Sequence, residues 1–312
     1  MVSARMPRVF ILSSLLGGSF LVSQQQLPRI AYDVKDCVVK IEVHLTHLHD
    51  GERVSDQLKR CFSESDYCVI GTGVRVNDAG DVVTAAHVAR DTGIVSQTLK
   101  NIGIESEVMV AGPAPNAEYV GARAQNSGGA SRASIRAIDS EHDVAVLEPD
   151  HVGQGFTSID DQPRARRQDF REVKLDMQRP AAGEEIFALG FPEYSAGLIS
   201  TAGTITMSVG SKNLVEAKKS GDTELVPVYR AGLEMSPGNS GAPLFRTSDG
   251  ALRGIVSEIA EGRDVIATVV PASEIAKVLS KYAIRWDAAP VRQTNGDTSK
   301  LGHKRNHSRQ GP

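Results

Sequence analysis

Three short motifs in this 312-residue sequence place acid–base and nucleophilic side chains where a fold could bring them together. His87 lies in TAAHV, at the end of a β-branched run, and Asp143 lies in HDVAVL, immediately before another apolar run. Ser240 lies in SPGNSGAPL, a glycine-flanked turn that precedes a third apolar run. Each motif alone is common in structural turns. The ordered set of His, Asp and Ser in these contexts is much harder to obtain by chance.

These residue types suit nucleophilic catalysis. A serine hydroxyl attacks poorly until a base takes its proton, and a neutral histidine can do this near pH 7. A carboxylate on the other imidazole nitrogen fixes the tautomer and stabilises the imidazolium. Gly238 lacks a Cβ, so the turn can tighten and point the N–H groups of Gly238 and Ser240 at a developing oxyanion. The motifs therefore predict Ser240 as nucleophile, His87 as base and Asp143 as its orienting acid.

The three motifs resemble the signatures of chymotrypsin-fold serine proteases. The Pro-Gly-Asn-Ser-Gly form of the third motif is similar to that of the HtrA-like branch, and GTGV, ALGFP and GTIT at residues 71–74, 188–192 and 203–206 resemble further segments of that branch. The resemblance runs roughly over residues 38–282. It implies two six-stranded antiparallel β-barrels with the triad between them, a serine endopeptidase acting on proteins or peptides, and no cofactor or metal. Residues 283–312 are too few for the PDZ domain usual in HtrA-like proteases, so we expect none.

The resemblance also bears on specificity. In chymotrypsin-like folds the residue six positions before the nucleophile lies at the base of the pocket for the side chain preceding the cut, and here this residue is Glu234. Ser257 and Ile259 would form the pocket wall. A carboxylate at the base would select Arg or Lys, because a desolvated charge pair adds affinity that an apolar ligand lacks. The alternative is that Glu234 points away from the pocket, and the sequence leaves both open.

The expected elements are mostly strands. Short β-branched and apolar runs recur between Gly, Asn and Asp residues, which predicts an all-β sandwich or barrel. The runs are 38–43, 69–76, 82–86, 144–147, 186–189, 204–209, 242–245, 254–257 and 265–270. One helix should begin near Pro271, because Ile275, Val278, Leu279 and Tyr282 follow helical spacing. Polar stretches predict loops at 44–68, 111–134 and 150–172.

These elements suggest four parts: a targeting segment at 1–30, a first barrel at 31–160, a second barrel with its helix at 161–287, and a disordered tail at 288–312. Arg5 and Arg8 precede a short apolar run and then three glutamines, which is typical of a secretory signal. The run is shorter than the roughly 20 residues of a membrane span. We therefore expect an exported protein, periplasmic or secreted, without a stable span; an uncleaved N-terminal anchor is the alternative.

Cysteine use agrees with export. Cys61 and Cys68 bracket a polar hexapeptide, close enough for a small disulfide loop in an oxidising compartment. Cys37 would be left over, although its pairing with either of the other two remains possible because spacing alone does not fix connectivity.

Other function classes fit less well. The 35 basic and 38 acidic residues give a net charge of −3, so no nucleic-acid partner is expected. The basic run at 164–167 and the basic tail are expected to be solvated. An α/β-hydrolase needs the order Ser, acid, His, and the histidines after Ser240 are His303 and His307 in the expected tail, so this class is excluded.

Two further alternatives remain. A metal site at His44, His47 and His49 is disfavoured, because no acidic or cysteine partner has ligand spacing nearby. A catalytically silent binding protein on the protease fold would be expected to lack a triad member. A serine-reactive fluorophosphonate probe separates that class from an enzyme, since labelling would require Ser240.

Overall fold

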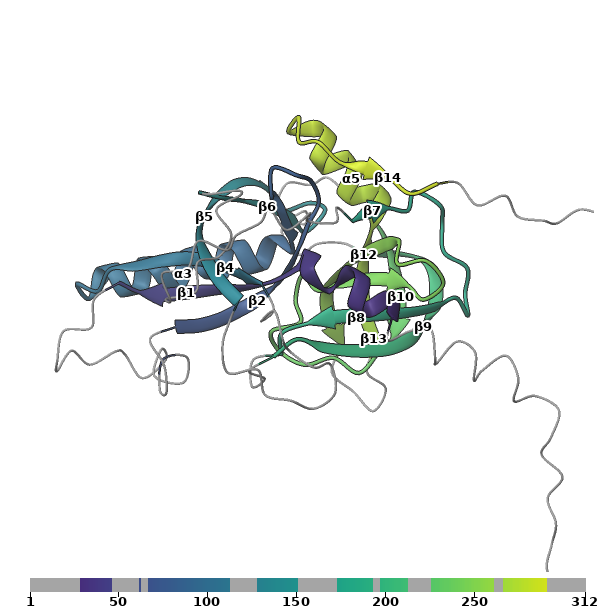
Figure 1. Ribbon diagram of the computed structural model, residues 1–312, viewed down its shortest axis with the longest axis horizontal. Coiled ribbons are helices and arrows are strands. Elements are labelled where there is room, and N and C mark those ends of the chain that lie inside the picture. The colour runs from purple at the N-terminus through teal and green to yellow at the C-terminus, as the bar shows by residue number, and fades with distance from the viewer. Residues whose placement is uncertain are drawn as a thin grey trace, which may run out of the picture.

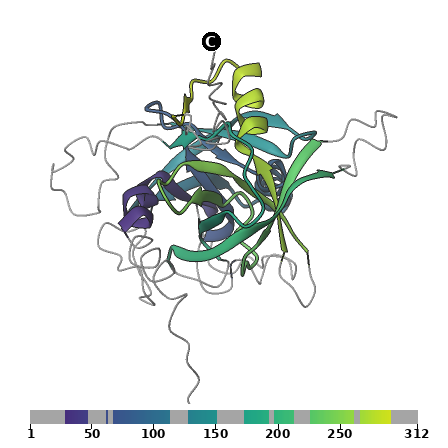
Figure 2. The same ribbon diagram turned by 90° about the vertical axis from the view of Figure 1, so that its right-hand side faces the viewer.

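The structure is a computed structural model, in which two β-barrels lie side by side (Figures 1 and 2). It describes residues 29–46, 62, 67–112, 128–150, 173–192, 197–212, 226–260 and 266–290. The first barrel is closed, with strand order β1-β2-β3-β6-β5-β4, and neighbouring strands are antiparallel. Its strands are β1 (Val38–Leu45), β2 (Tyr67–Arg75), β3 (Val82–Thr84), β4 (Ser106–Gly112), β5 (Gly128–Asp139) and β6 (Val144–Pro149).

The second barrel closes through an extra pairing. Its sheet has the order β11-β8-β9-β10-β13-β12-β7-β14, and β11 also pairs with β12, so six antiparallel strands form a ring. Strands β7 and β14 add to it in parallel. The strands are β7 (Lys174–Leu175), β8 (Glu185–Gly190), β9 (Ile199–Lys212), β10 (Val226–Gly232), β11 (Pro243–Arg246), β12 (Leu252–Ala260), β13 (Ile266–Pro271) and β14 (Asp287–Ala288). The prediction of two six-stranded antiparallel barrels is confirmed.

Alternation along each strand explains the barrel interiors. In β1, Val39 and Ile41 point into the apolar core of the first barrel, as the two-residue period of a strand requires. Lys40 and Glu42 lie on the opposite face, are also buried, and form an ion pair with each other. The interior of the second barrel is a separate cluster that includes Ile186, Ile205 and Leu244.

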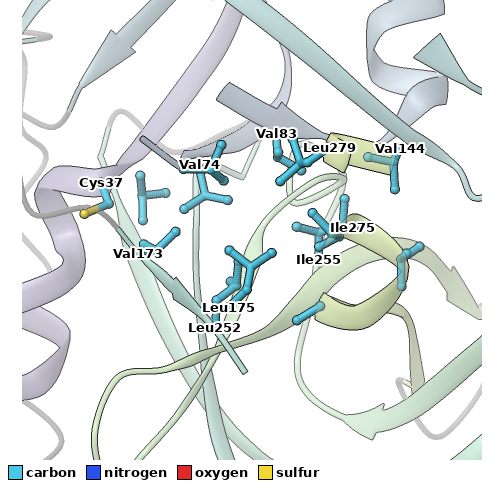
Figure 3. Close-up of a cluster of buried hydrophobic side chains, with 14 of the residues drawn as sticks. Cys37, Val74, Val83, Val144, Val173, Leu175, Leu252, Ile255, Ile275 and Leu279 are labelled. Carbon is cyan, nitrogen blue, oxygen red and sulfur yellow. The ribbon is translucent and has the colours of Figure 1, made fainter. Parts of the chain in front are cut away.

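A third cluster joins the two barrels (Figure 3). Val74 and Val83 enter it from the first barrel, and Leu252 and Ile255 enter it from the second. Leu279 contributes from the C-terminal helix, and all five side chains are fully buried. The barrels therefore share one continuous hydrophobic core, which fixes their relative position and the alignment of residues carried by each.

The C-terminal helix, α5 (Ala272–Lys281), begins where predicted, with Pro271 as its N-cap residue. It crosses from the second barrel to the β5–β6 hairpin of the first. Lys281 Nζ lies 2.8 Å from Asp139 Oδ2, His142 Nε2 lies 3.5 Å from Glu274 Oε2, and the Tyr282 hydroxyl donates to the Ile138 carbonyl at 3.2 Å. Helix α5 thus braces that hairpin.

Helix α3 (Ala86–Asn101) has no counterpart among the predicted elements. Its buried positions are mostly small, including Ala86, Ala89 and Thr92, so it lacks a strong apolar stripe, and Ile94 is exposed. The predicted strand at 82–86 ends too late, because residue 86 already belongs to α3.

The loop predictions are wrong at their ends. Residues 44–45 and 67–68 belong to strands β1 and β2, and 111–112 and 128–134 belong to β4 and β5. Strands β4, β5 and β10 were not predicted as such, because polar side chains interrupt their apolar runs. These segments form strands because they pair with neighbouring strands as each barrel closes, and such pairing is not visible in a sequence pattern.

The N-terminal helical turn at residues 29–34 packs against the second barrel. Ile30 and Val34 approach Gly250, in the turn between β11 and β12, so closely that a Cβ there would lie 3.1 Å from either side chain. Within the described ranges no helix combines the length and apolarity that a membrane crossing needs. The predicted targeting segment, the predicted loop at 150–172 and the predicted tail lie largely or wholly outside the described residues, so the predicted domain boundaries stay predictions.

Candidate active site

His87 is positioned by a strand-to-helix junction. Strand β3 ends at Thr84, Ala85 is the extended N-cap residue, and His87 lies in the first turn of α3. Its backbone N–H donates to Asp143 Oδ1 at 3.1 Å, and its side chain is 30% exposed. The junction thus ties the backbone of the candidate base to the candidate acid and leaves the imidazole partly open to solvent.

Asp143 is presented by the β5–β6 hairpin. Asp139 pairs with Val144 across the hairpin, and the Asp139 carboxylate accepts the His142 N–H at 3.1 Å, which stabilises the intervening turn. Asp143 has a φ of 53°, in the left-handed region that non-glycine residues seldom adopt, although Asp tolerates it better than most. This backbone geometry turns the carboxylate away from the strand direction and toward His87.

Two residues, His87 and Ser257, hold the Asp143 carboxylate by their side chains, in addition to the His87 backbone N–H. His87 Nδ1 lies 3.1 Å from Oδ2 and 3.2 Å from Oδ1, and the Ser257 hydroxyl donates to Oδ2. Burial raises the pKa of Asp143, but the hydrogen bonds and charge interaction with His87 and the bond from Ser257 outweigh burial, so its pKa is lowered. The ionised carboxylate places the proton on Nδ1 and leaves Nε2 of His87 free to accept one.

Two consecutive turns present Ser240. The Asn239 N–H donates to the Ser236 carbonyl at 3.1 Å, and the Ala242 N–H donates to the Asn239 carbonyl at 2.9 Å. The third residues of these turns, Gly238 and Gly241, have φ values of 90° and 80°, as type II turns require. A side chain at either glycine would be strained, so the glycines of the motif are needed for the loop's shape.

Close packing brings the Ser240 loop against the first barrel. A Cβ on Gly241 would lie 2.2 Å from the Thr72 carbonyl oxygen, so the loop tolerates no side chain there. A Cβ on Gly71 would lie 2.8 Å from the side chain of Val88, the neighbour of His87, and 3.0 Å from the Ser240 carbonyl oxygen. The loop that carries Ser240 therefore lies beside the start of α3, and the structure brings all three predicted triad residues to one junction between the barrels.

The other predicted site residues are distributed differently. Ser257 is buried, and its hydroxyl faces Asp143, a role that the sequence analysis did not assign. A polar residue ending the buried run GIVS was the signal available for it. Glu234 is exposed. Ile259 pairs with Ala267 across β12 and β13, but its side chain lies outside the described residues. The pocket wall formed by Ser257 and Ile259 stays a prediction.

Of the residues predicted for a disulfide or a metal site, the structure describes Cys37, Cys68 and His44. Cys61 lies outside the described residues, so its disulfide with Cys68 stays a prediction, while Cys37 is a buried thiol in the shared core. His47 and His49 also lie outside the described residues. His44 Nε2 lies 2.8 Å from Glu42 Oε2.

One further group has ligand atoms close enough for a metal ion, namely Asp139, Glu141 and His142. The Asp139 carboxylate is already bonded to His142 Nδ1 and to Lys281 Nζ, both at 2.8 Å. Both oxygens of the Asp139 carboxylate are thus already engaged, and these bonds form an ion-pair network that joins α5 to the hairpin.

Comparison with known proteins gives a family match. The model of the trypsin-like peptidase domain matches residues 71–255, which is more than half of the chain. Among curated proteins nothing matches. Among solved structures, the Rv3671c protease from M. tuberculosis in its active form aligns with a TM-score of 0.53 at 18% identity, covering 93% of this chain and 97% of that one. The HtrA-type protease AlgW with a decapeptide aligns with a TM-score of 0.52 at 16% identity, covering 81% and 66%. These structural likenesses show a shared fold.

Proposed function

The chain belongs to the trypsin-like peptidase domain family and is a serine protease, and we propose that it cleaves internal peptide bonds through an acyl-enzyme formed on Ser240. The observation that carries this mechanism is the contact of 3.1 Å between His87 Nδ1 and Asp143 Oδ2, next to the loop that presents Ser240. Substrates are proteins or peptides, and the chemistry needs no cofactor.

Acylation begins when His87 Nε2 accepts the Ser240 hydroxyl proton as Oγ bonds to the carbonyl carbon of the substrate. The carbonyl oxygen becomes an oxyanion, which the N–H groups of Gly238 and Ser240 stabilise. One such donor is typically worth about 10²–10³ in rate. His87 then gives its proton to the amine as the C–N bond breaks. Deacylation repeats these steps with water as the nucleophile and restores the Ser240 hydroxyl.

The direct test compares Ser240→Ala with Ser236→Ala, a change at an exposed serine in the same loop. Both variants should fold like the wild type. Ser240→Ala should lose hydrolysis of a protein substrate by several orders of magnitude and should lose labelling by a fluorophosphonate, whereas Ser236→Ala should keep both. Near wild-type hydrolysis by purified Ser240→Ala would refute the mechanism. An unlabelled, inactive but folded wild type would instead favour a silent binding protein.

The position of Glu234 bears on which side chain the enzyme prefers before the cut. A carboxylate at the closed base of a pocket would be largely buried, so the exposure of Glu234 favours the alternative in which it faces solvent. We therefore propose cleavage after small aliphatic residues, the preference usual in the HtrA-like proteases that the motifs resemble, with a peptide-library profile unchanged in Glu234→Gln. A preference for Arg or Lys that disappears in this variant would place Glu234 in the pocket.

We further infer that the protein is exported and that residues 1–30 direct export. The basic start and short apolar run support this inference. N-terminal sequencing of the mature protein would separate a cleaved signal from an uncleaved anchor.

A further inference from the structure

Thr72 lies where the first barrel meets the nucleophile loop. It is the central residue of GTG in β2 and is fully buried. A Cβ on Gly71 would lie 2.8 Å from Val88, and one on Gly73 would lie 2.5 Å from Val82. The glycines on either side thus allow β2 to approach its neighbours closely. Thr72 is the member of this triplet that retains a side chain.

Thr72 bonds the carbonyls of both residues whose N–H groups would form the oxyanion hole. Its hydroxyl donates to the Gly238 carbonyl at 2.8 Å, and its backbone N–H donates to the Ser240 carbonyl at 2.9 Å. The same hydroxyl accepts the Phe191 N–H, from the second barrel, at 3.0 Å. One residue of the first barrel therefore fixes the peptides on the C-terminal side of Gly238 and of Ser240.

We infer that the Thr72 hydroxyl is a positioning group that keeps the Gly238 N–H aimed at the reacting carbonyl, an inference that rests on the proposed function. Gly238 has a φ of 90° and no side chain to restrict it, so its orientation depends on what holds its neighbouring peptides. The Thr72 hydroxyl holds one of them. His87 belongs to the same barrel as Thr72, so this bond also sets the oxyanion donors at a constant distance from the base.

The chemical reason for a hydroxyl is its double role. It must accept from the Phe191 N–H and donate to the Gly238 carbonyl at the same time, and a threonine or serine oxygen can do both. A valine at this position would have nearly the same shape but would leave the buried Phe191 N–H and Gly238 carbonyl without partners. The peptide between Gly238 and Asn239 could then rotate to recover a hydrogen bond elsewhere. Because no side chain restricts Gly238, this rotation would also turn the preceding peptide and misalign the Gly238 N–H.

The test uses Thr72→Val, Thr72→Ser and the control Thr92→Val. Thr92 is also a fully buried threonine of the first barrel that donates to a carbonyl, that of Ala89 at 2.7 Å, but within α3. With a fluorogenic peptide, kcat should fall about 10- to 100-fold in Thr72→Val, with KM changed by no more than about twofold. Thr72→Ser should restore most of kcat, and Thr92→Val should keep kcat while losing comparable thermal stability.

A second readout separates positioning from general destabilisation. Affinity for a peptide boronate, which forms a tetrahedral adduct with the serine, should fall in Thr72→Val in proportion to kcat/KM, while affinity for a cleaved product peptide stays constant. Wild-type kcat in Thr72→Val, or a Thr72→Ser variant as impaired as Thr72→Val, would overturn the inference. If Thr72→Val does not fold, Thr72→Ala removes the same hydroxyl. An inactive wild type unaffected by Ser240→Ala would instead refute the proposed function.

Discussion

Two buried aspartates of this protein, each 4% exposed, serve opposite purposes. Asp143 faces the His87 imidazole and the Ser257 hydroxyl, and the imidazole is partly open to solvent. Asp176, in the second barrel, faces two guanidinium groups: Arg253 Nη1 lies 2.7 Å from Oδ2, and Arg246 bonds the same oxygen.

The difference lies in where the charge is compensated. Around Asp176 the positive charges of two buried guanidinium groups are always present, so the charge of this carboxylate is already compensated in the folded state. Around Asp143 the positive charge can come from one titratable group, His87, which accepts and returns a proton during the reaction. A buried carboxylate beside a histidine is thus prepared to stabilise an imidazolium, whereas one between permanent guanidinium charges stabilises the fold.

The largest expected effect is on activity. Asp143→Asn should reduce kcat by about 10⁴-fold, because an amide no longer fixes the His87 tautomer or stabilises its protonated form. Its loss of unfolding free energy should be smaller than that of Asp176→Asn. Steady-state kinetics and chemical denaturation of the same preparation measure both quantities. A fall in kcat below about tenfold would contradict the assignment of Asp143.

The reverse result is expected for Asp176→Asn. Arg246 and Arg253 would lose their shared carboxylate but keep Asp249 and Glu184 as partners, so the loss of unfolding free energy should lie below the roughly 3–5 kcal/mol typical of a buried charge left unpaired. Activity per folded molecule should stay near that of the wild type at low temperature. If denaturation midpoints were unchanged, the cluster would contribute little to the fold and the contrast with Asp143 would fail.

A smaller effect is expected for Ser257→Ala. This change removes one donor from the Asp143 carboxylate and leaves His87 in place, so kcat/KM should fall about tenfold, in line with the loss of one hydrogen bond to a charged group. Ser257→Thr, which keeps a hydroxyl, is the matched control. Equal losses in both variants would indicate a packing defect at this position instead.

The smallest effect concerns the acid stability of the brace between α5 and the hairpin. Burial raises the pKa of Asp139, but its bonds with Lys281 and His142 outweigh burial and lower the pKa to about 2. A carboxylate with a lowered folded-state pKa stabilises the fold at neutral pH, and this stabilisation is lost as the pH falls from about 5 toward 2. The difference in unfolding free energy between wild type and Asp139→Asn should shrink over that window. In Lys281→Ala the folded-state pKa of Asp139 is lowered less, so the loss should be smaller and should end at a higher pH.

Strand alternation predicted an all-β fold, and the three motifs, through their resemblance to chymotrypsin-fold proteases, predicted the two barrels and the candidate triad. Strand alternation is set by neighbouring residues, and a glycine-flanked serine turn is specified within one segment. The bond from Ser257 to Asp143 joins residues that are distant in the chain, and so does the contact of Arg253 with Asp176. Helix α3 was missed because its packing uses small residues against the barrel instead of a continuous apolar stripe. Contacts of this kind depend on how distant segments pack within and between the barrels, which a single sequence does not encode locally.

Helix α5 also gives the chain an order of events during synthesis. Residues 272–282 leave the ribosome after His87, Asp143 and Ser240, yet Lys281, Glu274 and Tyr282 brace the hairpin that presents Asp143. A nascent chain that lacks them holds Asp143 by fewer contacts. Cleavage competence is therefore expected to appear only when nearly the whole second barrel has been made, which protects unfolded nascent segments from a protease that is still being synthesised.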